Sequence, residues 1–201
     1  QMCGLTPGEI DPQNGRPVRL HIGHIKDKSL GGKDELANLR TLCSACNQGA
    51  SLAAGEILVL LNQDTRVEEG WLDALLHPLG ENSNIGLTTS KVLIMSESDQ
   101  INLCGQDVHY TGLVFGRGFL SPASGWDKHE EIAAVAGASF AIRRELWEAL
   151  GGLDETFFMY YEETDLSWRA QLQGYTCLLA PDSVVYHDYR PDQQSEIKLY
   201  Y

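Results

Sequence analysis

The sequence lacks long hydrophobic runs and is poor in positive charge. No apolar stretch exceeds five residues, the length of Ile57–Leu61, whereas a membrane-spanning helix needs about 20. Lys and Arg number 15 against 28 Asp and Glu, which gives a net charge of −13. Such a chain is, as a whole, a poor ligand for nucleic acid, because phosphate binding requires Lys and Arg. No charged and apolar leader opens it, so we expect cytoplasmic residence, with peripheral contact at the inner face of a membrane as an alternative.

Charge and cysteine are unevenly distributed along the 201 residues, a length that allows a small domain beside a medium one. Residues 1–50 hold six Lys and Arg and five Asp and Glu, whereas residues 51–201 hold nine and 23. The acidity therefore belongs to the second part. The five cysteines include Cys43 and Cys46 in a C-x-x-C pair. This spacing is used more often for metal or redox chemistry than for structural disulfides, which favours a reducing compartment.

The hydrophobic pattern after Gly55 is typical of an α/β domain. Ile57–Leu61 indicates a buried strand, and the polar turn Asn62–Thr65 follows it. Further elements are expected, in order, as a helix over 68–79, a strand over 85–94, hairpins over 104–125, a strand over 134–142, helices over 144–150 and 163–172, and strands over 176–179 and 183–187. Before Gly55 the pattern predicts a strand over 18–25 and a helix that begins near Ala45.

Four short segments near the N-terminus occur in a specific order: Leu20-His-Ile-Gly-His-Ile25, Gly31-Gly32, Asn38-Leu-Arg40 and Leu42-Cys-Ser-Ala-Cys-Asn47. In order and spacing they resemble the HNH endonuclease family, a small ββα-metal module that cleaves DNA. The resemblance implies that His24 deprotonates water, Asn38 orients it, and Asn47 helps to hold Mg or Mn. A base of near-neutral pKa and a divalent metal suit phosphodiester cleavage. The sequence departs from the family at Gly23, where a metal-binding Asp or His is usual, and His21 is the substitute on the same strand face.

The resemblance also implies a structural zinc site formed by Cys3, Cys43 and Cys46. Structural zinc sites are nearly always four-coordinate, and the family's additional cysteine would lie immediately before Gln1. The alternative interpretation needs no metal. The two histidines are then ordinary strand residues, and the C-x-x-C cysteines form a reduced surface pair.

Four longer segments in the second part of the chain carry a different resemblance. They are Ala54–Thr65, Val135–Arg144, Gly151-Gly-Leu-Asp-Glu155 and Phe157–Leu166. From Ala45 to about Arg190 they resemble, in order and spacing, family 2 glycosyltransferases of the GT-A fold, especially the rhamnosyltransferase type that builds bacterial surface polysaccharides. The resemblance implies inverting transfer of a sugar from a nucleotide sugar, a dTDP- or UDP-sugar, to a glycan or lipid-linked acceptor. It also implies the fold class α/β, as a partial GT-A domain with a Rossmann-like mixed sheet and flanking helices.

The acidic turn after Ile57–Leu61 is the expected metal site, because open α/β sheets bind ligands at the carboxyl ends of their strands. A divalent cation lets acidic residues approach a sugar diphosphate, so Asp64, assisted by Asn62, is the candidate ligand. Oxygen ligands suit Mg or Mn. The resemblance implies His187 as a further ligand. Taken alone, such a turn is also common where no ligand binds.

Inverting transfer requires a carboxylate that takes the proton of the acceptor hydroxyl, and the expected helix near residue 163 opens with Glu162–Asp165. The resemblance implies Glu163 as this base, in place of the family's usual Asp, with Asp165 as the alternative. We expect this helix start and the Asp64 turn to face a single pocket. Carboxylates in a first helical turn are also favourable with the helix dipole, even without catalysis. The implied acceptor-site residues are Asp154, Glu155 and Glu162.

The two resemblances meet at Ala45-Cys-Asn-Gln-Gly49, which fits the end of the HNH pattern and also a glycosyltransferase helix before the metal turn. We therefore divide the chain into a truncated HNH-like module over 1–49 and a glycosyltransferase-like domain over 50–201 that lacks the nucleotide-binding strands of a whole GT-A domain. Without those strands the sheet is expected to expose a strand that would otherwise be central. The sequence favours a recombined or mis-assembled chain whose function is sugar transfer. Metal-dependent DNA cleavage is the alternative, and a nonfunctional product that folds only in part is the third interpretation.

Overall fold

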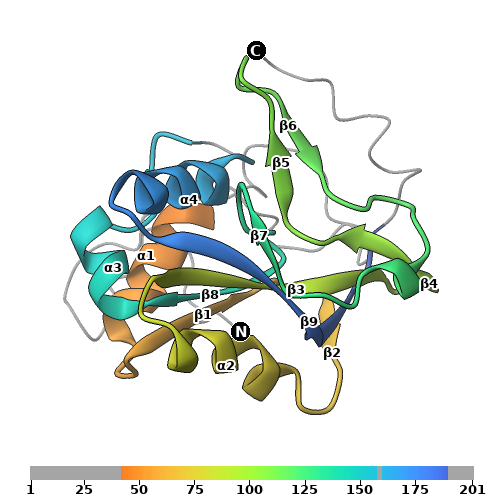
Figure 1. Ribbon diagram of the computed structural model, residues 1–201. Coiled ribbons are helices and arrows are strands. Elements are labelled where there is room, and N and C mark those ends of the chain that lie inside the picture. The colour runs from red at the N-terminus through yellow and green to blue at the C-terminus, as the bar shows by residue number, and fades with distance from the viewer. Residues whose placement is uncertain (1–41, 158–159, 190–201) are drawn as a thin grey trace, which may run out of the picture.

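A computed structural model describes residues 42–157 and 160–189, and their side chains from Cys46 onward. Figure 1 shows a central sheet with helices on both faces. The helices are α1 (Leu42–Leu52), α2 (Trp71–Glu81), α3 (Arg144–Leu150), α4 (Glu162–Leu172) and the short 3-10 helix η3 (Ala123–Gly125). The strands are β1 (Ile57–Leu61), β2 (Thr65–Val67), β3 (Ile85–Ile94), β4 (Glu97–Leu103), β5 (Gln106–Val108), β6 (Val114–Gly116), β7 (Glu130–Ile132), β8 (Ser139–Arg143) and β9 (Thr176–His187).

Seven of the described strands form one mixed sheet. Its order is β1-β8-β3-β9-β2, with β4 beside β3 and β7 beside β9, while β5 and β6 form a separate hairpin. The central strands β3 and β9 pair in parallel, and the other pairings in the sheet are antiparallel. All residues of β3 except Lys91 are buried. β1 forms an edge, since among the described residues it pairs only with β8.

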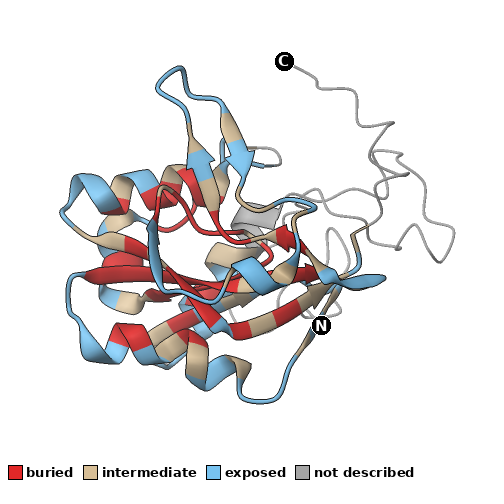
Figure 2. Cartoon of the chain, turned by 45° about the vertical axis from the view of Figure 1, so that its right-hand side comes forward, coloured by how far each residue is buried: buried red, intermediate tan, exposed pale blue. Residues whose placement is uncertain are grey.

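Helices cover both faces of the sheet. α1, α3 and α4 pack on one face and α2 on the other (Figure 1). Successive side chains of β8 point to opposite faces of the sheet, so this strand contributes to the core on both faces. Phe140 and Ile142 pack in one core with Leu166 of α4. Ala141, which lies between them in sequence, packs with Leu75 of α2. Figure 2 shows the buried residues gathered in the sheet and on the inner sides of the helices, while the β5–β6 hairpin projects outward.

The helices in the described ranges are short. None of these helices is long and apolar enough to cross a bilayer. α1, α2 and α4, the longest of them, have 11 residues each, which is about half of the length that a bilayer core demands.

α4 is held on the sheet by two buried side chains and one hydroxyl. Leu166 and Ala170, which lie on the same face of the helix, are fully buried. Ser167 donates a hydrogen bond to the backbone carbonyl of Glu163 at 2.7 Å and accepts one from the N–H of Val135 at 3.2 Å. The start of α4 therefore lies against the segment that leads into β8, which fixes Glu163 relative to the sheet.

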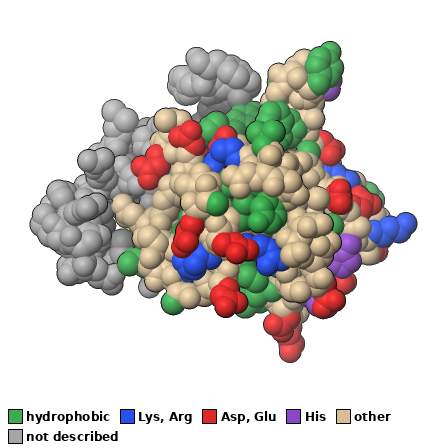
Figure 3. All heavy atoms as spheres, turned by 60° about the vertical axis from the view of Figure 1, so that its left-hand side comes forward, with side chains coloured by type: hydrophobic (Ala, Val, Ile, Leu, Met, Phe, Trp, Pro, Cys, Tyr) green, Lys and Arg blue, Asp and Glu red, His purple; other side chains and the backbone are tan. Residues whose placement is uncertain are grey.

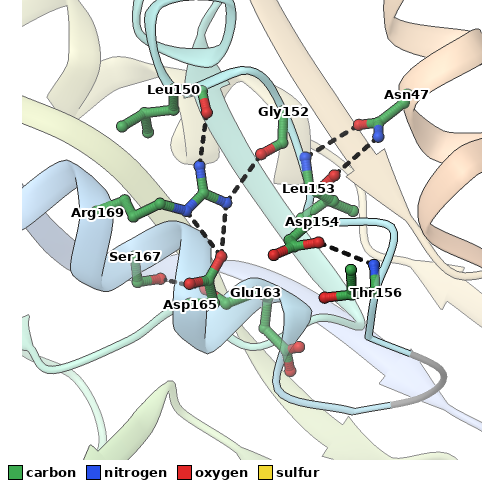
Figure 4. A network of polar contacts seen from close by, with 10 residues as sticks. All are labelled: Asn47, Leu150, Gly152, Leu153, Asp154, Thr156, Glu163, Asp165, Ser167 and Arg169. Atoms are coloured by element: carbon green, nitrogen blue, oxygen red, sulfur yellow. Dashed lines mark hydrogen bonds and ion pairs between the residues drawn. The ribbon is translucent and has the colours of Figure 1, made fainter.

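α1 is part of the same folded unit as the sheet. Asn47 donates to the carbonyl of Leu153 at 2.8 Å and accepts from its N–H at 3.0 Å, so both ends of the amide are used (Figure 4). Near the C-terminal end of α1, the guanidinium of Arg144 donates to the carbonyls of Ala53 at 2.9 Å and Gly55 at 2.5 Å. The predicted domain boundary between residues 49 and 50 falls inside this helix. The division into two domains stays a prediction, because residues 1–41 lie outside the described ranges.

Most of the elements predicted from the sequence are present. β1, β3 and α3 have the predicted bounds, and α2 begins three residues later than predicted, at Trp71. The strand predicted over 134–142 is wrong in its first half, because β8 begins at Ser139, and the two strands predicted over 176–187 are one strand, β9. β4 is not among the predicted strands. The strand predicted over 18–25 lies outside the described residues.

Replacing Asn47 by Ala tests whether α1 stabilises the sheet domain. The substitution leaves the N–H and carbonyl of the buried Leu153 without their side-chain partner, which costs about 1–3 kcal/mol. We expect the free energy of unfolding, measured by urea denaturation, to fall by this amount. Gln48→Ala, at an exposed neighbouring position, should change it little. Equal stability of the two variants would show that the Asn47 contact contributes nothing.

Candidate active site

A cavity of about 650 Å³ runs along β1 and reaches the turn at the carboxyl end of this strand. It is lined by α1, β1, the turn after β1, the loop before β8 and the start of α4. The structure therefore brings Asp64 and Glu163 to one cavity, as expected from the sequence. The polar side chains among the lining residues are Asn62, Gln63, Asp64, Glu162 and Glu163, together with the thiol of Cys46.

The turn after β1 is held from both sides. The N–H of Asn62 donates to the carbonyl of Ala138 at 3.0 Å, and the N–H of Asp188 donates to the carbonyl of Asp64 at 2.9 Å. β2, which follows the turn directly, pairs with the end of β9. The turn is thus fixed between the loop before β8 and the end of β9, which sets the position of Asp64.

His187, the last residue of β9, lies beside Asp64. Its Nε2 is 3.4 Å from Asp64 Oδ2, and its Nδ1 is 2.8 Å from Oδ1 of Asn102 on β4. Asn102 is 2% exposed, so this contact holds the imidazole ring in one orientation. When Nδ1 donates to Asn102, the lone pair of Nε2 faces the Asp64 carboxylate, and the two side chains could together hold a divalent cation.

Asp64 and His187 lie side by side and are the candidate metal donors. Asn62 and Asp64 line the cavity, whereas His187 is not among its lining residues. Among the described residues, no group of three or more His, Cys, Asp or Glu side chains is placed to hold a metal ion. Mg²⁺ commonly binds through one or two protein carboxylates and completes its shell with water and substrate phosphates. The donor set therefore fits a divalent cation that binds together with a phosphate ligand.

Glu163 is the most deeply buried carboxylate of the cavity. It is 8% exposed, accepts a hydrogen bond from Gln106 Nε2 at 2.8 Å, and lies close to Gly137. Burial, followed by the charge of Glu162, raises the pKa of Glu163 to about 7. A carboxyl group with a near-neutral pKa at a cavity can accept a proton during catalysis at neutral pH.

The other two carboxylates at the start of α4 have different surroundings. Burial raises the pKa of Glu162, and its Oε2 has no hydrogen-bond partner among the described residues. Asp165 Oδ2 instead lies 2.7 Å from both Nε and Nη2 of Arg169, whose guanidinium also donates to two backbone carbonyls at the end of α3 (Figure 4). Asp165 thus holds the end of α3 through Arg169 and is not among the residues that line the cavity. This geometry favours Glu163 over Asp165 as the base.

The predicted acceptor residues Asp154 and Glu155 lie in the loop after α3. The N–H of Thr156 donates to Asp154 Oδ1 at 2.8 Å, and this hydrogen bond lowers the pKa of Asp154. Glu155 Oε1 accepts a hydrogen bond from Asn47 Nδ2 at 3.3 Å. Glu162 lines the cavity, whereas Asp154 and Glu155 are not among the lining residues. Acceptor binding by these three residues stays a prediction.

Most residues predicted for DNA cleavage and zinc binding lie outside the described ranges. Cys43 is the second residue of α1, but its side chain lies outside the described part. Cys46 is half-buried and packs against the core, and the Asn47 amide is engaged with Leu153. Both predicted sites stay predictions. The residues outside the described ranges are Cys3, His21, His24 and Asn38.

Three residues of the site, Asn102, Gln106 and Gly137, are not identified as functional by the sequence. Gly137 lies within the motif Val135–Arg144, so a signal for it was present. Asn102 and Gln106 lie on β4 and β5, where single polar residues show no periodic or motif signal. Their importance comes from contacts with His187 and Glu163, which are distant in sequence.

The sequence matches two protein families. Residues 57–200 match the family described as glycosyl transferase family group 2. Residues 1–51 match the family described as HNH endonuclease. The first match includes Asp64, Glu163 and His187, and the second ends inside α1.

Two similar proteins illustrate the relationship in the second part of the chain. Polypeptide N-acetylgalactosaminyltransferase 11 of Xenopus tropicalis is 29% identical over 152 residues, which are 71% of this chain and 25% of that protein. O-antigen biosynthesis protein RfbC of Myxococcus xanthus is 32% identical over 136 residues, which are 64% of this chain and 10% of that protein. The chain therefore spans a quarter or less of the length of these two relatives.

Two solved structures have a similar fold. GalNAc-T7 with UDP, GalNAc and Mn²⁺ gives a TM-score of 0.61 at 23% identity, covering 74% of this chain and 30% of that chain. Mannosyltransferase PcManGT from Pyrobaculum calidifontis, in complex with GDP-Man and Mn²⁺, gives a TM-score of 0.50 at 18% identity, covering 74% and 36%. The predicted mixed α/β fold, similar to GT-A glycosyltransferases, is confirmed for the described residues.

The raised pKa of Glu163 makes protein stability depend on pH. Its carboxyl titrates at about 7 in the folded protein and near its ordinary value of 4.5 when unfolded, so the folded state binds the proton more tightly. The stabilising contribution is therefore fully present below the lower pKa and is lost as pH rises toward the folded pKa. Urea denaturation between these pH values should show a fall in the free energy of unfolding that is smaller in Glu163→Gln. The same change of the unfolding free energy with pH in the unsubstituted protein and in Glu163→Gln would contradict the raised pKa of Glu163.

Proposed function

The chain belongs to glycosyl transferase family group 2, and we propose that its described part is the catalytic half of a transferase that uses a nucleotide-sugar donor and a divalent cation. The observation that carries this proposal is the single cavity that Asp64 and Glu163 share. A carboxylate at the end of a strand suits a cation and diphosphate, and a buried carboxyl of near-neutral pKa suits proton transfer.

Asp64 and His187 are the proposed protein ligands of the cation, with Asn62 beside them. A bound Mg²⁺ or Mn²⁺ offsets the charge of the diphosphate and stabilises it as a leaving group. Asn102 keeps Nε2 of His187 directed toward Asp64 through its 2.8 Å contact with Nδ1. Both similar solved structures contain Mn²⁺, which supports a divalent cation here.

Glu163 is the proposed general base. It takes the proton of the acceptor hydroxyl as the hydroxyl oxygen forms a bond to the anomeric carbon of the donor. The bond between that carbon and the nucleoside diphosphate breaks in the same step, and attack from the opposite side inverts the configuration. With a pKa of about 7, Glu163 is partly deprotonated at neutral pH, and the hydrogen bond from Gln106 favours the charged form.

The donor and acceptor classes follow from the relatives and the sequence motifs. The similar solved structures hold UDP and GDP-Man, and the motifs resemble those of enzymes that use dTDP- or UDP-sugars, among them rhamnosyltransferases. RfbC is an O-antigen biosynthesis protein, which supports a glycan or lipid-linked acceptor in surface polysaccharide synthesis. Such a transferase acts in the cytoplasm, with peripheral contact at the inner face of the membrane where its acceptor is lipid-linked.

Asp64→Asn tests the cation site. Loss of the ligand charge should weaken Mn²⁺ binding in the presence of UDP, followed by electron paramagnetic resonance, by about 10- to 100-fold. Metal-dependent hydrolysis of UDP-N-acetylgalactosamine should fall in parallel. Asp73→Asn, at an exposed position of α2, is the matched control and should leave both quantities unchanged. Unaltered Mn²⁺ affinity in Asp64→Asn would remove Asp64 from the cation site.

Metal-dependent DNA cleavage is the second candidate function, and the match of residues 1–51 to HNH endonucleases favours it. In this reading His24 is the base, Asn38 orients the water, His21 and Asn47 hold Mg or Mn, and the cysteines bind zinc. On the face drawn in Figure 3, the Lys and Arg side chains of the described residues lie next to Asp and Glu side chains and form no continuous basic patch. Residues 1–41, which make up most of the match to HNH endonucleases, contain six Lys and Arg.

Plasmid nicking distinguishes this second function from sugar transfer. We expect any nicking in the presence of Mn²⁺ to disappear in His24→Ala, because the base is lost, and to persist in His77→Ala, at an exposed position of α2. Gel electrophoresis of supercoiled DNA measures both variants. The nuclease assignment fails if the unsubstituted chain leaves the plasmid intact or if His24→Ala nicks it as fast.

A further inference from the structure

The backbone of Gln106, the first residue of β5, is fixed by the loop that leads into β8. Its N–H donates to the carbonyl of Ala134 at 2.8 Å, and its carbonyl accepts from the N–H of Ala134 at 3.2 Å. The base of the projecting β5–β6 hairpin is therefore anchored beside the segment that contains Gly137. These two hydrogen bonds fix the backbone of Gln106, and neither of them involves α4.

The side-chain amide of Gln106 bridges two consecutive residues of α4. Thr164 Oγ1 donates to its Oε1 at 2.5 Å, and its Nε2 donates to Glu163 Oε1 at 2.8 Å. When Glu163 is ionised, the reverse orientation of the amide would place its oxygen against a carboxylate that has no hydrogen to donate. The amide is thus held with its NH₂ group toward Glu163.

Gly137 provides a second contact to the same carboxylate. The Gly137 backbone lowers the pKa of Glu163, and a Cβ at this position would lie 3.0 Å from Oε1 and 3.1 Å from Cδ. Only glycine permits this close approach without displacing the carboxylate. Glu163 is therefore contacted by two segments outside α4, namely β5 and the loop before β8.

We propose that Gln106 is a positioning residue for the general base, and that its amide holds the Glu163 carboxylate in one orientation at the cavity. This inference rests on the proposed role of Glu163 in sugar transfer. Glutamate has one more rotatable bond than the aspartate that the family usually carries at this position. The hydrogen bond from Gln106 restricts rotation about this additional bond, which keeps the longer side chain in a productive geometry.

The ionisable groups around Glu163 cannot replace Gln106. Glu162 lies next to it on α4, Tyr160 precedes that helix, and Asp64 faces the same cavity from the turn after β1. The charge of Glu162 opposes a negative charge on Glu163, whereas the hydrogen bond from Gln106 and the backbone of Gly137 favour it. Removal of the Gln106 donor should therefore raise the pKa of Glu163.

Gln106→Leu removes both hydrogen bonds of the amide at a similar side-chain size. We expect the pKa of Glu163, followed by ¹³C NMR of the labelled carboxyl and assigned with Glu163→Gln, to rise. With UDP-N-acetylgalactosamine as donor, kcat should fall about 10- to 100-fold at unchanged donor KM, and the acidic limb of the pH profile should move to higher pH. Gln173→Leu, at an exposed position after α4, is the matched control.

Thr164→Val is the second variant, because it removes only the hydroxyl that orients the amide, and its effects should have the same direction. An unchanged pKa of Glu163 in either folded variant overturns the positioning role, whatever the transfer activity. A raised pKa in a chain whose unsubstituted form transfers no sugar instead overturns the general-base assignment, and with it the role of Gln106. A raised pKa with a lower kcat supports both.

Discussion

The constraint on which the site depends is the attachment of the turn after β1 to two other parts of the sheet. The N–H of Asn62 donates to the loop before β8, and the carbonyl of Asp64 accepts a hydrogen bond from Asp188, the residue after β9. β9 pairs with the buried strand β3 along most of its length, so its end is held by the centre of the fold. Asp64 and His187 meet because of this backbone arrangement.

The loop after α3 connects the helices on one face of the sheet. Arg169 of α4 binds two carbonyls at its start, and Asn47 of α1 binds the backbone of Leu153 within it. The orientation of α4, and therefore of Glu163, is thus coupled to α1. Asn47 satisfies the end of the HNH pattern, but in the described fold its amide serves the glycosyltransferase domain.

The sequence predicts those parts of the site that follow regular patterns. A buried strand followed by an acidic turn points to Asp64 as a candidate. Glu163, with Asp165 as the alternative, comes from the family resemblance of the segment Phe157–Leu166. Residues 134–138 resemble a strand because they are small and apolar. The N–H groups of Val135 and Ala136, however, donate to the side-chain hydroxyls of Ser167 and Thr89 rather than to the backbone of a neighbouring strand.

Contacts between distant segments explain the remaining differences between sequence and structure. Pro181 and Asp182 suggest a break between two strands, but β9 continues through them, because a register shift opposite Ser90 and Lys91 accommodates the extra residues. Ser183 in this irregularity bonds to Ser90. Gln106 could not be identified for the same reason, since its partners on α4 come close only after folding.

The edge of β1 has a consequence for the behaviour of the protein in solution. Along this edge the backbone has no ladder partner among the described residues, and the side chains of Val59 and Leu61 are 36% and 42% exposed. Unpaired apolar strands are templates for intermolecular β-pairing. The sheet can therefore be extended at β1 by one further strand, whether that strand comes from another segment or from a second molecule.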